Sequence, residues 1–207
     1  MIAAGLALVA LAALLWLANG IRRIGAVSQG RPIGPRQNTA LVLVDLQTVF
    51  WDDGPYAPAA RLEAETAIRA EIAAAKAAGW PVIAVRQEWS IPSTRVLARL
   101  TMGGRAVAGT AGTELAPAFA GLPDHVLVKR VQDAFETGAL DRLLDSLDVG
   151  RLRIVGLDAA YCVAKTALAA RRRGYAVEIA TRGTLAADPA AGRAMFDRLA
   201  ASGCTLD

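Results

Sequence analysis

Histidine is nearly absent from this 207-residue chain, which contains a single one, His125. A metal site built on a cluster of histidines is therefore excluded, and a Ser-His-Asp triad could use only this residue. Cysteine is also scarce, because Cys162 and Cys204 are the two in the chain and neither belongs to a CxxC motif. We expect no metal ion and no cofactor. In the reducing cytoplasm, either thiol could serve as a nucleophile.

Basic residues are not concentrated in blocks. Arginine supplies 20 of the 23 basic residues, and the net charge is only +4. No basic segment alternates with aromatic residues, which make up 5% of the chain. Nucleic acid is therefore not an expected partner.

The first charged side chain is Arg22, and Leu, Ala, Val, Ile and Trp fill nearly every position before it. A helix of 17 to 21 such residues is roughly 25–31 Å long, close to the hydrocarbon thickness of a bilayer. A cleaved signal peptide is not indicated, because no basic residue precedes the run and no small-x-small site follows it. We predict that residues 1–19 form a transmembrane anchor helix. The alternative is a buried or frayed Ala/Leu helix of a soluble protein.

The arginines near this apolar run all follow it, at Arg22, Arg23, Arg31 and Arg36. By the positive-inside rule, the helix is single-pass with its N-terminus outside, and the rest of the chain is in the cytoplasm. Residues 20–38 also contain four glycines and two prolines, which is typical of a flexible linker between anchor and domain.

Residues 39–207 have the pattern of an α/β domain. Aliphatic runs typical of buried parallel strands occur at 40–45, 81–86, 125–129, 153–156 and 175–180, and a last short strand is expected near Cys204. Helices are predicted over 59–78, 140–147 and 162–173 and from Asp188 onward. This order predicts a three-layer α/β/α, Rossmann-like, doubly wound fold with a mainly parallel sheet of about six strands.

The segment 87–123 shows little apolar periodicity and contains Gly103, Gly104, Gly109 and Gly112. We predict a long irregular loop there, with about one helical turn. Long loops in compact domains often form active-site lids or interface arms.

Three chemically competent residues stand where predicted strands end. Asp45 closes the first strand, Lys129 closes the third, and Cys162 follows the fourth at the start of a helix. Ligands of open parallel sheets bind beyond these carboxyl ends. A helix N-terminus and a nearby ammonium both favour a thiolate, and a carboxylate can accept the thiol proton. The three residues therefore supply a nucleophile, a base and a stabilising charge without a histidine.

Each of these residues also has a structural explanation by itself. An aspartate after a strand often caps a turn, a lysine at a strand end is usually solvated, and an isolated cysteine in an apolar segment usually packs in a core. Their joint placement at one edge of the sheet favours the catalytic interpretation.

The sequence resembles the isochorismatase-like cysteine hydrolases, a superfamily that includes nicotinamidase, N-carbamoylsarcosine amidase, ureidoacrylate hydrolase and biuret hydrolase. The resemblance covers about 39–207. It rests on four separated motifs in the right order, which are LVLVDLQTVF (41–50), GTAGTEL (109–115), VLVKRVQDAFETGAL (126–140) and IVGLDAAYCVAKTALAARRRGYAV (154–177).

The resemblance implies a catalytic triad of Asp45 as base, Lys129, and Cys162 as nucleophile. It also implies an oxyanion hole built from the backbone N–H groups of Asp158 and Cys162. Members of the superfamily usually have a cis peptide bond at the position of Leu157-Asp158. The implied reaction is hydrolysis of an amide, ureido or carbamoyl C–N bond of a small molecule through a Cys162 thioester, by a homo-oligomer that is a dimer or tetramer.

Two departures from the superfamily pattern narrow the activity. Ala159-Ala160 replaces the Thr-Asp found in many members, so the hydrogen bonds around this loop must come from elsewhere. The metal-binding Asp-x-His of nicotinamidases is replaced by the segment Arg86-Gln-Glu-Trp-Ser90. A metal-dependent nicotinamidase is therefore not expected. Isochorismatase itself lacks the nucleophilic cysteine, so its chemistry is also disfavoured.

Four aromatic residues flank the motifs and are candidates for lining the substrate pocket, namely Trp51, Trp89, Phe135 and Tyr161. The sequence does not identify the substrate. Two other functions stay open: a different use of the same thiolate, and a catalytically silent, membrane-anchored, oligomeric interaction module.

Overall fold

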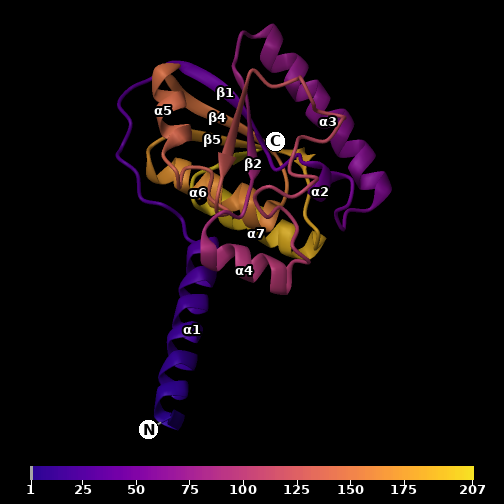
Figure 1. The fold of residues 1–207 in the computed structure, drawn as a ribbon. Helices are drawn as coiled ribbons and strands as arrows, with labels where there is room; N and C mark the ends of the chain where they lie inside the picture. Colours follow the sequence, from indigo (N-terminus) through magenta and orange to yellow (C-terminus); the bar gives the residue numbers. More distant parts are fainter. Residues whose placement is uncertain (1) are drawn as a thin grey trace.

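A six-stranded parallel sheet forms the centre of the protein in the computed structural model, which describes residues 2–207 (Figure 1). The strands lie in the order β3-β2-β1-β4-β5-β6, and all neighbours are parallel. Their bounds are β1 Asn38–Val44, β2 Val82–Gln87, β3 His125–Lys129, β4 Val149–Gly156, β5 Ala176–Thr184 and β6 Thr205–Leu206. The order changes direction between β1 and β4, which confirms the predicted doubly wound α/β fold.

Helices cover both faces of the sheet, because the side chains of its central strand alternate between two cores. Leu41 and Leu43 face the core beneath α3, whereas Val42 and Val44 face the core beneath α5, α6 and α7. All four are fully buried. These helices are α3 Pro58–Ala77, α5 Ala139–Ser146, α6 Ala164–Arg172 and α7 Pro189–Ala201. Burial on both faces explains why β1 is a continuous aliphatic run.

The remaining helices lie at the carboxyl edge of the sheet. They are α1 Ile2–Ile24, the short α2 Thr48–Trp51, and α4 Pro92–Thr101. α4 has ten residues, so the prediction of about one helical turn within 87–123 was too short. Few of its residues are strongly apolar, so the sequence pattern is weak. The helix begins with Pro92 in its first turn, and its own Leu97 and Ala98 pack into a small hydrophobic core.

α1 projects from the domain along most of its length (Figure 1). Ala4–Ile24 has a mean hydropathy of 2.1, and its large side chains are exposed, for example Leu8 at 68% and Leu14 at 64%. The helix is long and apolar enough to cross a membrane. It ends at Ile24, beyond the predicted end at residue 19, and Arg22 and Arg23 in its last turn complement the helix dipole.

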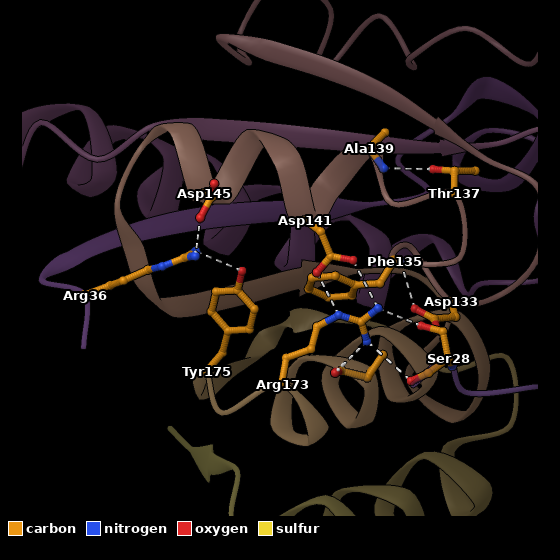
Figure 2. Close-up of polar contacts among 11 residues, drawn as sticks. Ser28, Arg36, Asp133, Phe135, Thr137, Ala139, Asp141, Asp145, Arg173 and Tyr175 are labelled. Carbon is orange, nitrogen blue, oxygen red and sulfur yellow. Dashed lines mark hydrogen bonds and ion pairs between the residues drawn. The ribbon is translucent and has the colours of Figure 1, made fainter. Parts of the chain in front are cut away.

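The segment 25–37 lies along the domain, and this differs from the predicted flexible linker. Its backbone is hydrogen bonded to distant elements: Ser28 N–H donates to Asp133 Oδ2 at 2.7 Å, and Ile33 N–H donates to the Arg173 carbonyl at 2.7 Å. Arg36 pairs with Asp145 and contacts the Tyr175 hydroxyl (Figure 2). We call residues 25–37 the strap, because these bonds fix it to the domain.

Arg173 explains why the strap is held so closely. Its guanidinium is 2% exposed, pairs with Asp141 at 2.7 Å, and lies 4.5 Å from the centre of the Phe135 ring (Figure 2). The Ser28 carbonyl and hydroxyl accept further bonds from it at 3.3 and 3.1 Å. A Cβ at Gly30 would lie 2.3 Å from Arg173 Nε, so this position has room only for glycine. A buried guanidinium needs such partners, and the strap supplies several of them.

Candidate active site

The ends of β1, β3 and β4 bring Asp45, Lys129 and Cys162 together. Lys129 Nζ lies 3.0 Å from Asp45 Oδ2 and 3.3 Å from Cys162 Sγ. The side chains of Lys129 and Asp45 are 1% and 3% exposed, respectively. Adjacent parallel strands β1 and β4 end at the same edge, and β3 reaches it from beyond β2. The three residues singled out in the sequence thus form one cluster around the ammonium.

Asp45 has an unusual backbone conformation, with φ of 54°. The left-handed region costs a residue with a side chain about 1–3 kcal/mol and persists where the surroundings impose it. Here the Asp45 N–H donates to the Val85 carbonyl at 3.0 Å, and its carbonyl accepts from Gln47 N–H at 2.8 Å. These bonds turn the chain sharply after β1 and place the carboxylate next to Lys129.

Gln87, the last residue of β2, is a member of the cluster that sequence reasoning missed. Its Oε1 accepts a bond of 2.6 Å from Lys129 Nζ, which also donates to the Val131 carbonyl at 3.3 Å. Together with Asp45 and Cys162, these groups surround the ammonium, which has three protons to donate. Gln87 therefore fixes where the lysine charge lies.

Gln47 in turn fixes the backbone of Gln87. Its Oε1 accepts from Gln87 N–H at 2.6 Å, and its Nε2 donates to the carbonyls of Gln87 and Thr113 at 3.0 and 2.7 Å. The residue is fully buried. Two glutamines at consecutive strand ends are the sequence signal that could have revealed this support, since buried amides need complete hydrogen bonding.

Burial sets the protonation of the cluster. It raises the pKa of Asp45, against the opposing effect of Lys129. It lowers the pKa of Lys129, but the charges of Asp45 and Cys162 outweigh it and the net shift is upward. Burial and the Asp45 charge also raise the pKa of the Cys162 thiol well above its usual range. The raised pKa of Cys162 favours a neutral thiol in the resting site, from which a base must remove the proton before the sulfur can react.

Asp45 has one carboxylate oxygen still available to that thiol. Oδ2 is occupied by Lys129, whereas Oδ1 is buried without a hydrogen-bond partner among residues 2–207. Asp45 and Cys162 are close enough that each shifts the pKa of the other. The pKa of Lys129 is raised, so the lysine keeps its proton, and Asp45 is the group beside the sulfur that could accept one.

Cys162 lies in a π-helical turn, Ala159–Val163, that directly precedes α6. Asp158 caps this turn, because its Oδ1 accepts from Ala160 N–H at 2.8 Å. Its Oδ2 accepts from Ala187 N–H at 2.6 Å and from the Tyr56 hydroxyl at 3.4 Å. These bonds take the place of those that the superfamily's Thr-Asp would make. Single π turns of this kind are frequent at functional sites.

The backbone of Asp158 fits the predicted oxyanion hole in one respect. Within residues 2–207, its N–H has no hydrogen-bond partner, whereas the N–H groups of Leu157 and Ala159 donate to Val44 and Leu185. The Leu157-Asp158 peptide bond is trans, as are all the peptide bonds that the structure describes. The cis bond implied by the resemblance is thus not found, in keeping with the strong trans preference of non-proline bonds.

The four predicted pocket aromatics lie in different environments. Trp51 is 2% exposed and packs edge-on against Phe119 in one core, and Phe135 is 1% exposed beneath Arg173 in the other. Trp89 is buried near α1 and α4, and its indole N–H has no partner within the described residues. Tyr161, which precedes Cys162 in the chain, is 55% exposed. The structure therefore does not bring the four together.

Comparisons with known proteins identify the family and agree with the fold. The family model described as Isochorismatase domain matches residues 39–206. Among solved structures, the pyrazinamidase/nicotinamidase of Streptococcus mutans UA159 has a TM-score of 0.72 at 21% identity, covering 82% of this chain and 100% of that one. N-carbamoylsarcosine amidase of Thermoplasma acidophilum has a TM-score of 0.69 at 26% identity, covering 83% and 96%. No curated protein matches.

A third similar structure raises the question of a metal. Pyrazinamidase of Pyrococcus horikoshii, solved in complex with zinc, has a TM-score of 0.69 at 23% identity, covering 83% of this chain and 99% of that one. In the present protein, Arg86 near the end of β2 pairs with Glu88 just after the strand at 3.4 Å, so this carboxylate already has a cationic partner. Within residues 2–207, no group of three His, Cys, Asp or Glu side chains could hold a metal ion. The residues do not fit zinc.

Proposed function

The chain belongs to the isochorismatase family, and on that basis we propose that it hydrolyses a C–N bond of a small amide, ureido or carbamoyl compound through a thioester on Cys162. The observation that carries the proposal is the position of the Lys129 ammonium, within 3.3 Å of both the Asp45 carboxylate and the Cys162 sulfur. A buried base and a buried charge beside a partly exposed thiol supply the groups that nucleophilic catalysis needs.

In the acylation half, Asp45 takes the thiol proton and the sulfur attacks the substrate carbonyl carbon. A C–S bond forms, and the carbonyl electron pair moves to oxygen. The N–H groups of Asp158 and Cys162 stabilise this oxyanion, and one such donor is worth about 10²–10³ in rate. Collapse of the intermediate breaks the C–N bond, and the departing nitrogen takes the proton from Asp45.

In the deacylation half, Asp45 removes a proton from water, which attacks the thioester carbon. The C–S bond then breaks, and the proton held by Asp45 returns to the sulfur. The raised pKa of Asp45 suits both directions of transfer, because a base with a higher pKa takes a thiol proton more readily than an ordinary carboxylate. Lys129 stays charged throughout and stabilises the sulfur when it becomes a thiolate.

We also propose that α1 spans a bilayer, with the catalytic domain on the cytoplasmic side. The exposed leucines and valine of α1 support this, because a row of apolar side chains in water would be costly. The arginines after the helix support the orientation.

The test is ammonia or amine release by the full-length protein in detergent, measured with a panel of amides, ureas and carbamoyl compounds. Cys162→Ala should abolish ammonia or amine release without changing the melting temperature by more than a few degrees. Cys204→Ala should leave the release unchanged. If no compound turns over and iodoacetamide fails to modify Cys162 of the folded protein even when the pH is raised, the silent interaction module is the better account.

A further inference from the structure

The end of α1 is joined to α4 by close packing. A Cβ at Gly20 would lie 2.8 Å from Leu97 Cδ1 and 2.9 Å from Ser93 Cβ, so the two helices touch at this glycine. Ile24 and Leu97 share a small hydrophobic core, against which Leu17 also packs. In Figure 1, α4 lies beside the point where α1 leaves the domain. The position of α1 therefore fixes the position of α4.

This contact sets the depth of α4 if α1 spans a bilayer. About 20 helical residues cross the hydrocarbon layer of roughly 30 Å. Counted from Ile2, such a span ends near Ile21, so Gly20 lies close to the inner boundary and Arg22 and Arg23 lie among the headgroups. Because Leu97 and Ser93 touch Gly20, α4 lies at headgroup depth as well.

The exposed face of α4 has the composition of a helix at a membrane surface. Arg95 and Arg99 lie on this face one turn apart, and Arg105 is exposed in the turn after the helix. No aspartate or glutamate occurs between Trp89 and Thr113. Within residues 2–207, none of the three arginines forms an ion pair. The positive charge of this surface is thus not neutralised by acidic side chains.

Two large apolar side chains lie among these arginines. Leu100 is 70% exposed and Met102 is 37% exposed. Apolar residues flanked by arginines are typical of interfacial segments, where the apolar groups enter the acyl boundary and the basic groups bind lipid phosphates. A basic residue near an anionic leaflet contributes about fivefold in binding, equivalent to about 1 kcal/mol.

We propose that Arg95, Arg99, Leu100, Met102 and Arg105 form a contact surface for the headgroups of an anionic bilayer, which we call the α4 foot. This inference rests on the proposed membrane span of α1. With α1 in the bilayer and the α4 foot on the headgroups, α1 and the domain cannot tilt freely relative to the membrane. The carboxyl edge of the sheet then faces the bilayer, because Gln132, three residues after Lys129, donates its N–H to the Ile24 carbonyl at 3.1 Å.

Three leucines of similar exposure provide a test by site-directed spin labelling. Leu14 in α1, Leu62 in α3 and Leu100 in α4 are 64%, 68% and 70% exposed. Each is replaced by cysteine in full-length protein carrying Cys162→Ser and Cys204→Ala, and reconstituted in vesicles of phosphatidylcholine with or without phosphatidylglycerol. Collision with oxygen and with a water-soluble nickel complex then reports the depth of each label.

In anionic vesicles, we expect the label at position 14 to be deep, the label at 100 to be at headgroup depth, and the label at 62 to be in water. Arg95→Glu with Arg99→Glu should tilt the joined helices away from the headgroups and make the label at 100 more accessible to the nickel complex. Arg95→Lys with Arg99→Lys should retain its depth. Arg142→Glu with Arg151→Glu, an equal charge change at two exposed arginines away from the foot, should have no effect.

The outcomes separate this proposal from the anchor. A deep label at 14 with an aqueous label at 100 would leave the membrane span intact and overturn the foot. Equal depth at 100 in neutral and anionic vesicles would overturn headgroup binding through charge. An aqueous label at 14 would overturn both the membrane span and the foot. None of these results depends on catalysis.

Discussion

The ammonium of Lys129 donates a hydrogen bond of 3.3 Å to the sulfur of Cys162. A lysine that is already charged cannot remove the thiol proton, so in the proposed mechanism it stabilises the thiolate after that proton has gone to Asp45. Arginine should not substitute for Lys129, because its planar guanidinium is larger than an ammonium and places the charge elsewhere.

Gln87 positions this ammonium, and its loss should reduce turnover. Gln87→Ala removes a bond of 2.6 Å to a charged donor, an interaction worth about 1.5–3 kcal/mol. We expect kcat to fall roughly ten- to hundredfold with a smaller change in KM. Gln132→Ala is the matched control, since within residues 2–207 the Lys129 ammonium contacts Gln87, Val131, Cys162 and Asp45 but not Gln132. Equal rates for the two variants would remove Gln87 from the account.

The acid limb of the pH profile should reflect Asp45. The reaction needs its deprotonated form, and burial raises its pKa. As the pH falls, activity should therefore be lost at a higher pH than the ordinary aspartate value of about 4. Because the pKa of Cys162 is also raised, its alkylation by iodoacetamide should be slow at pH 7 and accelerate as the pH rises. Fast alkylation at neutral pH would show that the resting thiol is ionised.

Sequence reasoning identified the elements whose determinants are local. The aliphatic run before Asp45 indicates a strand buried on both faces, and the leucines at 140, 143, 144 and 147 indicate a helix. It missed what depends on distant partners. Gln87 resembles a solvated polar residue at a strand end until Lys129 is placed beside it. The strap resembles a linker because its order comes from Arg173, far along the chain. The thiol pKa follows from burial, which the helix-dipole argument leaves out.

The strap should contribute to stability through its fit to Arg173. Gly30→Ala places a Cβ 2.3 Å from Arg173 Nε, and this guanidinium cannot move without losing buried partners. Overpacking of this kind costs about 1–3 kcal/mol, or several degrees in Tm. Gly34→Ala, where a Cβ meets nothing within 4 Å, is the control. Thermal unfolding of full-length protein in detergent compares the two, and equal Tm values would mean that the strap is as free as a linker.

Metal chelation should leave activity intact. Arg86 in β2 pairs with Glu88 just after the strand, and the described residues contain no metal-binding cluster of carboxylates, thiols and imidazole. Turnover before and after EDTA treatment and dialysis should agree. Activity that is lost on dialysis and returns with zinc would contradict this prediction.

The thioester on Cys162 is the central claim, and mass spectrometry of acid-quenched protein tests it most directly. With a turned-over amide, ureido or carbamoyl substrate, the account predicts a mass increase equal to the acyl group on the peptide that contains Cys162. The adduct should be absent from Cys162→Ala, which should also be inactive. An active Cys162→Ala variant, or an adduct found on Cys204 alone, would contradict the account.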